Sequence, residues 1–504
     1  MILPRNSTTA EAEVDRRSAP FTGRRDVGFD VPLEVDLPGR VHHGEIDLLE
    51  QSDLSQADLS GKHPDSPSVP QPISRPLRLL YGLTDQCLSV GGMFVVNIAL
   101  ARVRSKEEYG IFALSYSLLT FLTGLHNAAI LEAYTIYGSG RYHQRFVGYR
   151  RLLWRSHLWL LGALSAFLLA AWQGLRWWHS PLASPSLLGM ALTCGVLLSV
   201  SFVRRTFYMR RRPDLAARFS AVFFVSCMGL LALAIRSERL NGFSAFLIVA
   251  LSWSLAGLFI VRDHPPREPS AREDSDARED SKGTGPAHAV DFLREQPGYW
   301  RDHWNYSRWV LVTALVFQFT AQAYFWAVAA LLSVPDVAEL RALYNLALPV
   351  DQIAVAITFL VMPQMALHYA ALEFGQLRHL WRQCASLYLG ISLAFALVVG
   401  AASLPLLHAM YGGKFDSAAP LLRWYALLPV VMAVGNATNA AMKSMEKPQA
   451  VFYAYLASGA ATLVFGIPLI VRFGLAGAMY GMLLSAASYT AALMFSFYRC
   501  NSTL

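Results

Sequence analysis

The stretch RLLYGLTDQCLSVGGMFVVNIALARVRSKEEYGIF, from Arg78 to Phe112, decides the fold. Its first part is an apolar run of about two dozen residues, long enough for a helix to cross the ~30 Å hydrocarbon core of a bilayer. A short charged loop from Arg102 to Glu108 follows, and a second apolar run begins after Gly110. A chain that crosses, turns sharply and crosses back is a polytopic membrane protein.

The composition of the whole chain agrees with this interpretation. Of its 504 residues, 54% are hydrophobic and only 15% are charged, whereas soluble proteins carry about a quarter charged residues. The net charge of +8 comes from basic residues that gather in short loops between apolar runs. The positive-inside rule describes this pattern, so the charge indicates membrane topology, and we expect no nucleic-acid partner.

Twelve apolar runs predict an all-α polytopic membrane protein. They are rich in Leu, Ala, Val and Phe with interspersed Gly, which suits closely packed membrane helices, and they lack the alternation of a transmembrane barrel. The runs are expected at about 78–101, 110–131, 151–172, 185–208, 217–235, 242–261, 305–332, 341–364, 382–404, 418–440, 449–471 and 474–497.

A charged segment after the sixth run divides the spans into two six-helix lobes. We expect lobes at residues 77–262 and 301–498, joined by a flexible cytoplasmic linker at 263–300 that contains Pro265-Pro266. Residues 1–76 are polar and aperiodic and are expected to form a disordered cytoplasmic tail. No cleavable signal peptide is expected, so the first span would act as an uncleaved anchor.

Lys and Arg in the connections predict the orientation. The larger set follows the even-numbered runs, so that side is expected to be the cytoplasm, with both termini there and the protein in the cytoplasmic (inner) membrane. The smaller, outer set is Arg102, Arg104, Lys106, Arg176, Arg236, Arg239, Arg341, Lys414, Arg423 and Arg472.

Cofactor and metal signals are weak. Most of the five cysteines lie in or near apolar runs without CxxC or metal-ligand spacing, so we expect packed thiols, no disulfide, no metal site and no cofactor. No P-loop motif is found, which disfavours direct ATP hydrolysis by this chain.

Two acids inside the spans are the first candidates for a transport pathway. Asp351 lies about ten residues into the eighth run, where a charge costs about 2.5–3.5 kcal/mol and therefore needs a cavity or a partner. It could bind a proton, a cation or substrate, or be a hydrogen-bonded packing acid. Asp85 lies nearer the cytoplasmic end of the first run, where a solvated, snorkelling acid is the alternative to a pathway residue.

Amides and arginines near the spans complete the candidate set. Gln318 and Gln322 are one helical turn apart and share a face; such amides line a cavity or bond neighbouring helices. The same two interpretations apply to Asn97 and Gln352. Arg204 and Arg205 could guide an anionic headgroup, or simply fix topology and contact acidic lipids. His126 and Asn127 could join a polar cavity, although a lone His is usually a packed one.

The chain also resembles a known family, through motifs spread over residues 77–498. The motifs are Asp85-Gln86, Asn97, Ala101-Arg102, Glu108-Tyr109-Gly110-Ile111-Phe112, Val361-Met362-Pro363, Tyr411-Gly412, Phe415, Ala418-Ala419-Pro420-Leu421-Leu422-Arg423, Ala440-Ala441-Met442-Lys443 and Lys447-Pro448. Their order and the six-plus-six layout are similar to the polysaccharide-biosynthesis, or O-antigen, flippases of the multidrug/oligosaccharidyl-lipid/polysaccharide (MOP) exporter superfamily.

The resemblance implies a MATE-like fold, with twelve transmembrane helices in two six-helix lobes around a central cavity. It implies a flippase that moves a lipid-linked oligosaccharide or polysaccharide precursor across the cytoplasmic membrane by alternating access. The implied partners are that glycan lipid, membrane lipids, H+ or Na+ as a coupling ion, and polysaccharide-assembly enzymes. One departure leaves the substrate's charge open: the basic residues stay near the span ends instead of lying deep in the spans.

Two other functions are weighed against the flippase. A drug or metabolite exporter on the same fold would have a smaller, more apolar cavity. A membrane glycosyltransferase or polymerase is less favoured, with Glu107 and Glu108 as its candidate acids. The outer loops are too short to hold two substrates at one face, so we expect a transporter and no catalytic residues.

Overall fold

The computed structural model describes residues 75–139, 146–179, 184–210, 212–263 and 287–502. The expected tail lies almost entirely outside these ranges, and so does the first part of the expected linker. All the regular structure in the described ranges is helical, which confirms the predicted fold class. The helices of the first half are α1 (Arg75–Val103), α2 (Lys106–His126), the π-helix η1 (Asn127–Leu131), α3 (Glu132–Ser139), α4 (Phe146–Trp177), α5 (Pro185–Met209), α6 (Pro213–Arg236) and α7 (Gly242–Asp263).

The second half repeats long apolar helices with more interruptions. Its helices are α9 (Ala287–Leu331), α10 (Val334–Ala370), α11 (Phe374–Ala401), α12 (Ser403–Tyr411), the 3-10 turn η2 (Asp416–Ala418), α13 (Ala419–Tyr425), α14 (Leu428–Ser444), α15 (Pro448–Ala461), the π-helix η3 (Thr462–Gly466) and α16 (Ile467–Ser502). The α9 helix begins at Ala287, so the last part of the expected linker is helical.

Eleven helical stretches in the described ranges are long and apolar enough to cross a membrane. The last stretch, Pro448–Cys500, has 53 residues and would be roughly 80 Å long if it were straight. Gly474 interrupts it with φ 59° and ψ −137°. Thr462 and Ser485, 23 residues apart, share a 2.9 Å hydrogen bond, although a continuous helix would separate them by roughly 35 Å. The chain therefore reverses at Gly474, and this stretch supplies both of the last two predicted spans.

Serine caps explain several of the tight turns between spans. The side chains of Ser105, Ser184 and Ser333 accept hydrogen bonds from backbone N–H groups at the starts of α2, α5 and α10. Each cap satisfies one of the N–H groups that a helix leaves unpaired in its first turn. These connections share the end of the bundle that the sequence predicts to face outward, called the outer end below; the opposite end is called the inner end.

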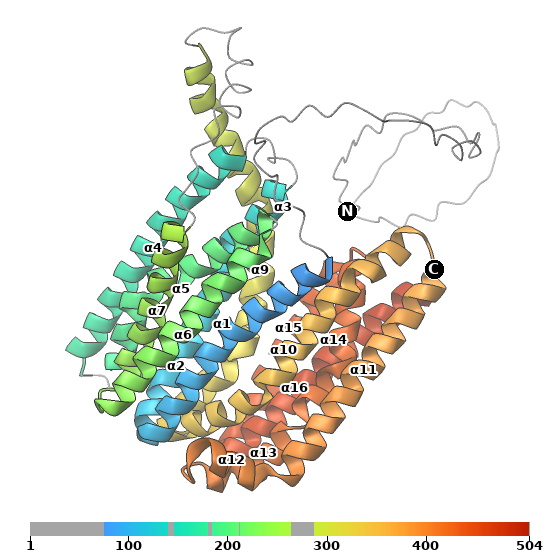
Figure 1. Cartoon of the computed structure of the whole chain (residues 1–504). Coiled ribbons are helices and arrows are strands. Elements are labelled where there is room, and N and C mark those ends of the chain that lie inside the picture. The colour runs from blue at the N-terminus through green and yellow to red at the C-terminus, as the bar shows by residue number, and fades with distance from the viewer. Residues whose placement is uncertain (1–74, 140–145, 180–183, 211, 264–286, 503–504) are drawn as a thin grey trace, which may run out of the picture. The chain divides into compact units, whose positions relative to one another are not determined.

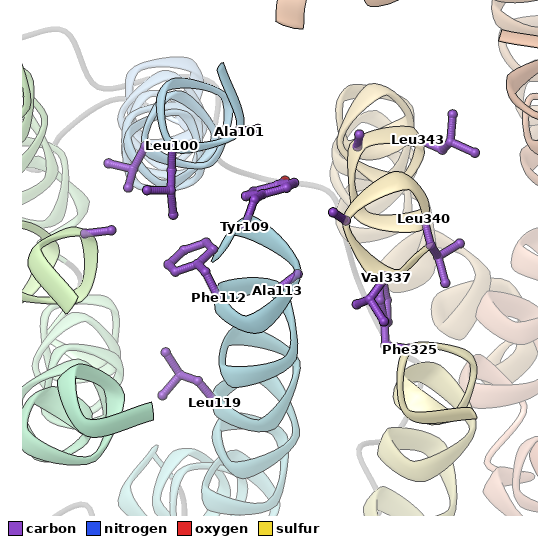
Figure 2. Close-up of a cluster of buried hydrophobic side chains, with 14 of the residues drawn as sticks. Leu100, Ala101, Tyr109, Phe112, Ala113, Leu119, Phe325, Val337, Leu340 and Leu343 are labelled. Carbon is purple, nitrogen blue, oxygen red and sulfur yellow. The ribbon is translucent and has the colours of Figure 1, made fainter. Parts of the chain in front are cut away.

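The two halves meet through α2, α9 and α10. Helix α1 packs on α6, and α5 and α6 pack on α7, whereas α11, α14, α15 and α16 pack together in the second half (Figure 1). Helix α2 contacts both α9 and α10. Figure 2 shows Tyr109 and Ala113 of α2 between Leu100 and Ala101 of α1 on one side and Leu340 of α10 on the other. One buried apolar cluster therefore runs from the first half into the second.

Large apolar side chains are exposed on the outside of the bundle. Leu258 on α7, Leu397 on α11 and Val471 on α16 are each about two-thirds or more exposed. Water disfavours such a surface, whereas lipid is as apolar as these side chains. Together with the long apolar helices, this makes the protein a multi-pass membrane protein.

Candidate functional site

A cavity of about 650 Å³ lies inside the second half of the bundle. Its walls come from α9, α10, α11, α13, α14, α15 and α16, and its volume is typical of a ligand site. Most of its surface is apolar, with a small number of polar side chains. These polar residues include Thr320, Gln322, Asp351, Thr358, Ser392, Asn436, Asn439, Lys443, Ser458 and Ser485.

Asp351 and Gln322 are the two predicted site residues that line this cavity. Asp351 is exposed to it, and in the described ranges no cation lies within ion-pair distance of its carboxylate. Pro349 stands two residues before it inside α10. Proline has no backbone N–H, so the carbonyl of Asn345, six residues before the acid, loses its usual helical donor.

Two buried amide oxygens in the cavity wall have no hydrogen-bond partner, those of Gln322 and Asn439. Leaving a buried acceptor unsatisfied costs about 1–3 kcal/mol. A ligand that brings hydroxyl or N–H donors to these oxygens would recover that free energy.

Tyrosine rings form much of the remaining wall. Tyr455 and Tyr489 stack with ring centroids 5.1 Å apart, and the Tyr324 hydroxyl bonds Ser485 at 2.8 Å. The lining tyrosines are Tyr324, Tyr344, Tyr388, Tyr425, Tyr455 and Tyr489. Such rings offer an apolar face and a polar edge in one side chain.

Asp85 lies away from this cavity and is held by the first half. Its carboxylate is completely buried. Arg204 on α5 donates to both of its oxygens, at 2.6 and 3.2 Å. Tyr208 donates to it at 2.5 Å, and the hydroxyl of Ser220 on α6 also donates to it. Asp85 is therefore a paired structural acid in this conformation, and the predicted solvated, snorkelling position is wrong.

The predicted headgroup arginines have protein partners. Arg204 is occupied by Asp85, and Arg205 donates to the side-chain oxygen of Asn127 at 3.1 Å. Gln352 accepts a 3.0 Å hydrogen bond from the amide of Gln86. That contact joins α1 to α10, so Gln352 bonds across the two halves, one residue after Asp351.

The two remaining predicted amides are packed. Asn97 is buried and donates to the carbonyl of Met93, one turn earlier in α1. The Gln318 side chain lies so close to Gly124 of α2 that a Cβ there would overlap it. These contacts place Gln318 at the junction of α2 and α9, while Gln322 one turn later lines the cavity.

Arg341, predicted to lie near the outer end of a span, is a buried basic residue. It lies inside α10 and is 4% exposed. Its guanidinium stands over Tyr116 of α2 at 4.4 Å and over Tyr344 at 4.8 Å from the ring centroids, and its Nε has no hydrogen-bond partner. Sequence periodicity placed Arg341 at the start of a span because it could not show that α10 begins at Val334.

Polar contacts join the two halves at the outer end. Lys106 forms a 2.6 Å ion pair with Glu339, and Asn345 donates to the Tyr109 hydroxyl at 2.9 Å. Lys414 donates to the carbonyls of Ala101, Arg102 and Arg104 at the C-terminus of α1, where a helix carries partial negative charge. Partial burial lowers the pKa of Lys414, and the positive charge of Lys106 lowers it further.

The candidate acids of the enzyme alternative lie at the same end. Glu108 accepts a hydrogen bond from the backbone of Gly242 at 3.3 Å and lies 3.9 Å from Arg104. Glu107 is exposed in the first turn of α2. Both acids sit in a helix-start position, where carboxylates are favoured by the exposed N–H groups.

Comparisons with known proteins identify the fold. No family model and no curated protein matches the chain. A MATE family transporter of the MOP superfamily in an inward-facing conformation matches with TM-score 0.62 and 14% identity, over 86% of this chain and 97% of its own. An outward-facing MATE transporter of the MOP superfamily matches with TM-score 0.54 and 13% identity, over 84% and 96%.

A third solved structure shares the same fold. It is a MOP superfamily transporter from Pyrococcus furiosus, described by the reverse polarity of its binding pocket; it matches with TM-score 0.53 and 13% identity, over 84% of this chain and 94% of its own. At these identities the likeness concerns the fold. The chain is therefore a multi-pass membrane protein with the fold of the MATE transporters of the MOP superfamily.

Proposed function

We propose that the protein is a flippase that moves a lipid-linked oligosaccharide across the cytoplasmic membrane by alternating access. The observation that carries this is the second-half cavity, whose walls combine tyrosine rings with amide side chains. A sugar ring has an apolar face of C–H groups and a rim of hydroxyls. Tyrosine faces suit the first, and the unpartnered oxygens of Gln322 and Asn439 suit the second.

Buried cations support an anionic carrier lipid. A glycan joined to lipid through a diphosphate brings negative charge into the bundle, which guanidinium and ammonium groups bind well. Arg341 lies inside the bundle with an unpartnered Nε, and Lys443 lines the cavity. These two groups would repel the substrate of an organic-cation exporter, whereas Asp351 in the same cavity would attract it, so the transport assay includes an organic-cation dye.

The conformation fits an inward-facing step of such a cycle. Contacts between the halves at the outer end, including the Lys106–Glu339 ion pair, close that end. The inward-facing transporter is also the better match of the two MATE conformations, with TM-scores of 0.62 and 0.54. In this proposal, substrate enters from the cytoplasmic side and opening of the outer contacts releases it.

The test is translocation of a fluorescent glycan on a polyprenyl diphosphate carrier in reconstituted vesicles. We expect transport by the wild type and about a thirtyfold lower rate in Asn436→Ala plus Asn439→Ala, because two lost hydrogen bonds of about 1 kcal/mol each make about 2 kcal/mol. Leu397→Ala, on the lipid-facing side of α11, is the matched control. Export of an organic-cation dye without any glycan movement would replace the flippase with the drug exporter.

A second variant in the same vesicle assay tests the role of Asp351. Asp351→Asn keeps the shape and removes the charge. We expect a sharply reduced rate in a folded variant, because the acid faces the cavity without an ion-pair partner in the described ranges. An unchanged rate would make Asp351 a packing residue and leave the flippase standing.

A further inference from the structure

Two histidines form a buried pair in the first half, outside the cavity described above. His126 is the last residue of α2 and His157 lies in α4. They are 4% and 0% exposed, and His126 Nε2 lies 2.9 Å from His157 Nδ1. The second nitrogen of His157 lies 3.2 Å from the hydroxyl of Ser199 on α5.

The hydrogen bonds fix where the protons lie. The Ser199 hydroxyl donates to the carbonyl of Gly195 at 2.8 Å, so its oxygen accepts from His157 Nε2–H. His157 Nδ1 is then the acceptor, because a neutral imidazole has one N–H and one lone pair. It follows that His126 Nε2–H donates to it, and that His126 Nδ1 carries a lone pair.

That lone pair has nothing to bond. His126 Nδ1 is buried and has no hydrogen-bond partner in the described structure. The pair is thus a buried proton acceptor: in the chain from Ser199 to His126 the other three ring nitrogens are bonded, and one basic nitrogen is left over.

The backbone beside the pair changes from α-helix to π-helix. The π-helix η1 begins at Asn127, the residue after His126, and such π-bulges are frequent at functional sites. Asn127 is bonded to Arg205, and the carbonyl of Ala129 bonds His303 of α9. Movement of α9 or α5 would therefore act directly on the segment that positions His126.

Other charged groups nearby could also respond to protons. The rings in contact with His157 are Trp154 and Phe202, which are not titratable. The titratable and charged residues on the helices packed around the pair include Glu132, Tyr134 and Tyr137 on α3, Tyr149, Arg150, Arg151, Arg155 and Arg176 on α4, Cys194, Arg204, Arg205 and Tyr208 on α5, and Tyr299, Arg301, Asp302, His303, Tyr306, Arg308 and Tyr324 on α9. No carboxylate among them bonds either imidazole.

We infer that His126 Nδ1 is the binding site for the coupling proton. Burial disfavours the charged imidazolium, so the present conformation is the proton-free state. Protonation gives His126 a second N–H that has no acceptor here, and it favours a conformation in which that N–H meets water. A ligand shifts a conformational equilibrium by its difference in affinity for the two states, and here the proton is that ligand.

The inference rests on the proposed function only for alternating access, and needs no particular substrate. The direct test uses the wild-type protein labelled with ¹⁵N-histidine in lipid nanodiscs, because ¹⁵N shifts distinguish the two tautomers and the imidazolium. We expect His126 to be neutral with a bare Nδ1 at about pH 8 and charged at about pH 5.5. A His126 resonance that stays neutral at about pH 5.5 would overturn the proposal.

A second measurement follows the outer end. Spin labels at Val103→Cys on α1 and Leu404→Cys on α12, in a variant whose five native cysteines are replaced, report opening through their distance. We expect the open fraction to rise about fivefold or more on acidification, within the usual range of coupling between sites. His126→Gln and His157→Gln should abolish this rise.

Two variants control for other histidines. His368→Gln removes a partly exposed ring beside Glu373 at the inner end, and His408→Gln removes an exposed ring beside Asp416 at the outer end. Both should keep the acid-driven opening. Opening that persists in His126→Gln would overturn the proton site.

The vesicle assay separates the two proposals. Glycan movement by the wild type at a rate independent of pH would overturn the proton site and leave the flippase standing. Acid-driven opening that requires His126, without movement of any glycan lipid, would support the proton site and overturn the substrate class.

Discussion

Asp85 shows how a charge can be kept inside the first half. Three donors from α5 and α6 surround its carboxylate, those of Arg204, Tyr208 and Ser220. A buried ion pair adds little to folding stability compared with well-packed apolar residues in the same place. Removing one partner, however, leaves the other charge buried and uncompensated. The cluster therefore fixes how α1 packs against α5 and α6.

We expect Asp85→Asn to lower the free energy of unfolding by about 3 kcal/mol, because it strands the Arg204 guanidinium. Arg204→Gln should cost a similar amount, and the double variant clearly less than the sum of the two. Unfolding in mixed micelles, followed by tryptophan fluorescence, measures all three. Additive losses would show that Asp85 and Arg204 do not interact.

Hydropathy could predict that Asp85 and Asp351 need partners or a cavity, but it could not choose between the two. The partner of Asp85 lies 119 residues away, and only the packing of α1 against α5 brings them together. His157 was not among the predicted site residues, although it is, like Asp351, a polar side chain inside an apolar run. Applying to His157 the reasoning used for Asp351 would have found it.

At the scale of helices, the outer contacts between α2 and α10 hold the two halves together. Lys106 and Glu339 lie 2.6 Å apart with their side chains about a quarter exposed or less. Ion pairs that are partly shielded from water are screened less by salt than exposed ones. Their loss should therefore favour opening of the outer end.

We expect Lys106→Glu to raise the open fraction reported by the labels at positions 103 and 404, because two acids then face each other. Glu339→Lys should do the same. The swapped pair, Lys106→Glu with Glu339→Lys, should return the distance distribution towards that of the wild type. If the swap stays as open as either single variant, the ion pair does not close this end.

The spans themselves were predictable, because each apolar run is long enough to identify itself. The interruptions within the helices were harder to predict. The break at Gly474 was anticipated only as a gap between two runs, and the π-helices η1 and η3 have no sequence signature. The extension of α9 back to Ala287 crosses polar sequence, including Pro297, where composition favoured a linker.

At the scale of the whole molecule, charge and hydropathy together predict the orientation in the membrane. Some of the basic residues at both ends have partners within the protein. Arg341, counted with the outer loops, is buried inside α10, and Lys414 is occupied by the carbonyls of α1. Arg204 and Arg205 at the inner end have protein partners as well, so the orientation stays a prediction from the Lys and Arg content of the connections.

Labelling of single cysteines in intact cells tests this orientation. Trp178 follows α4 at the outer end, and His379 lies near the start of α11 at the inner end; both are exposed. In the cysteine-free variant, a membrane-impermeant maleimide should label Trp178→Cys in intact cells and His379→Cys only after permeabilisation. Because the chain crosses between these positions and its termini in a fixed order, that result would also place residues 75 and 502 in the cytoplasm. The reverse pattern would invert the membrane orientation, and substrate would then enter the present conformation from outside the cell.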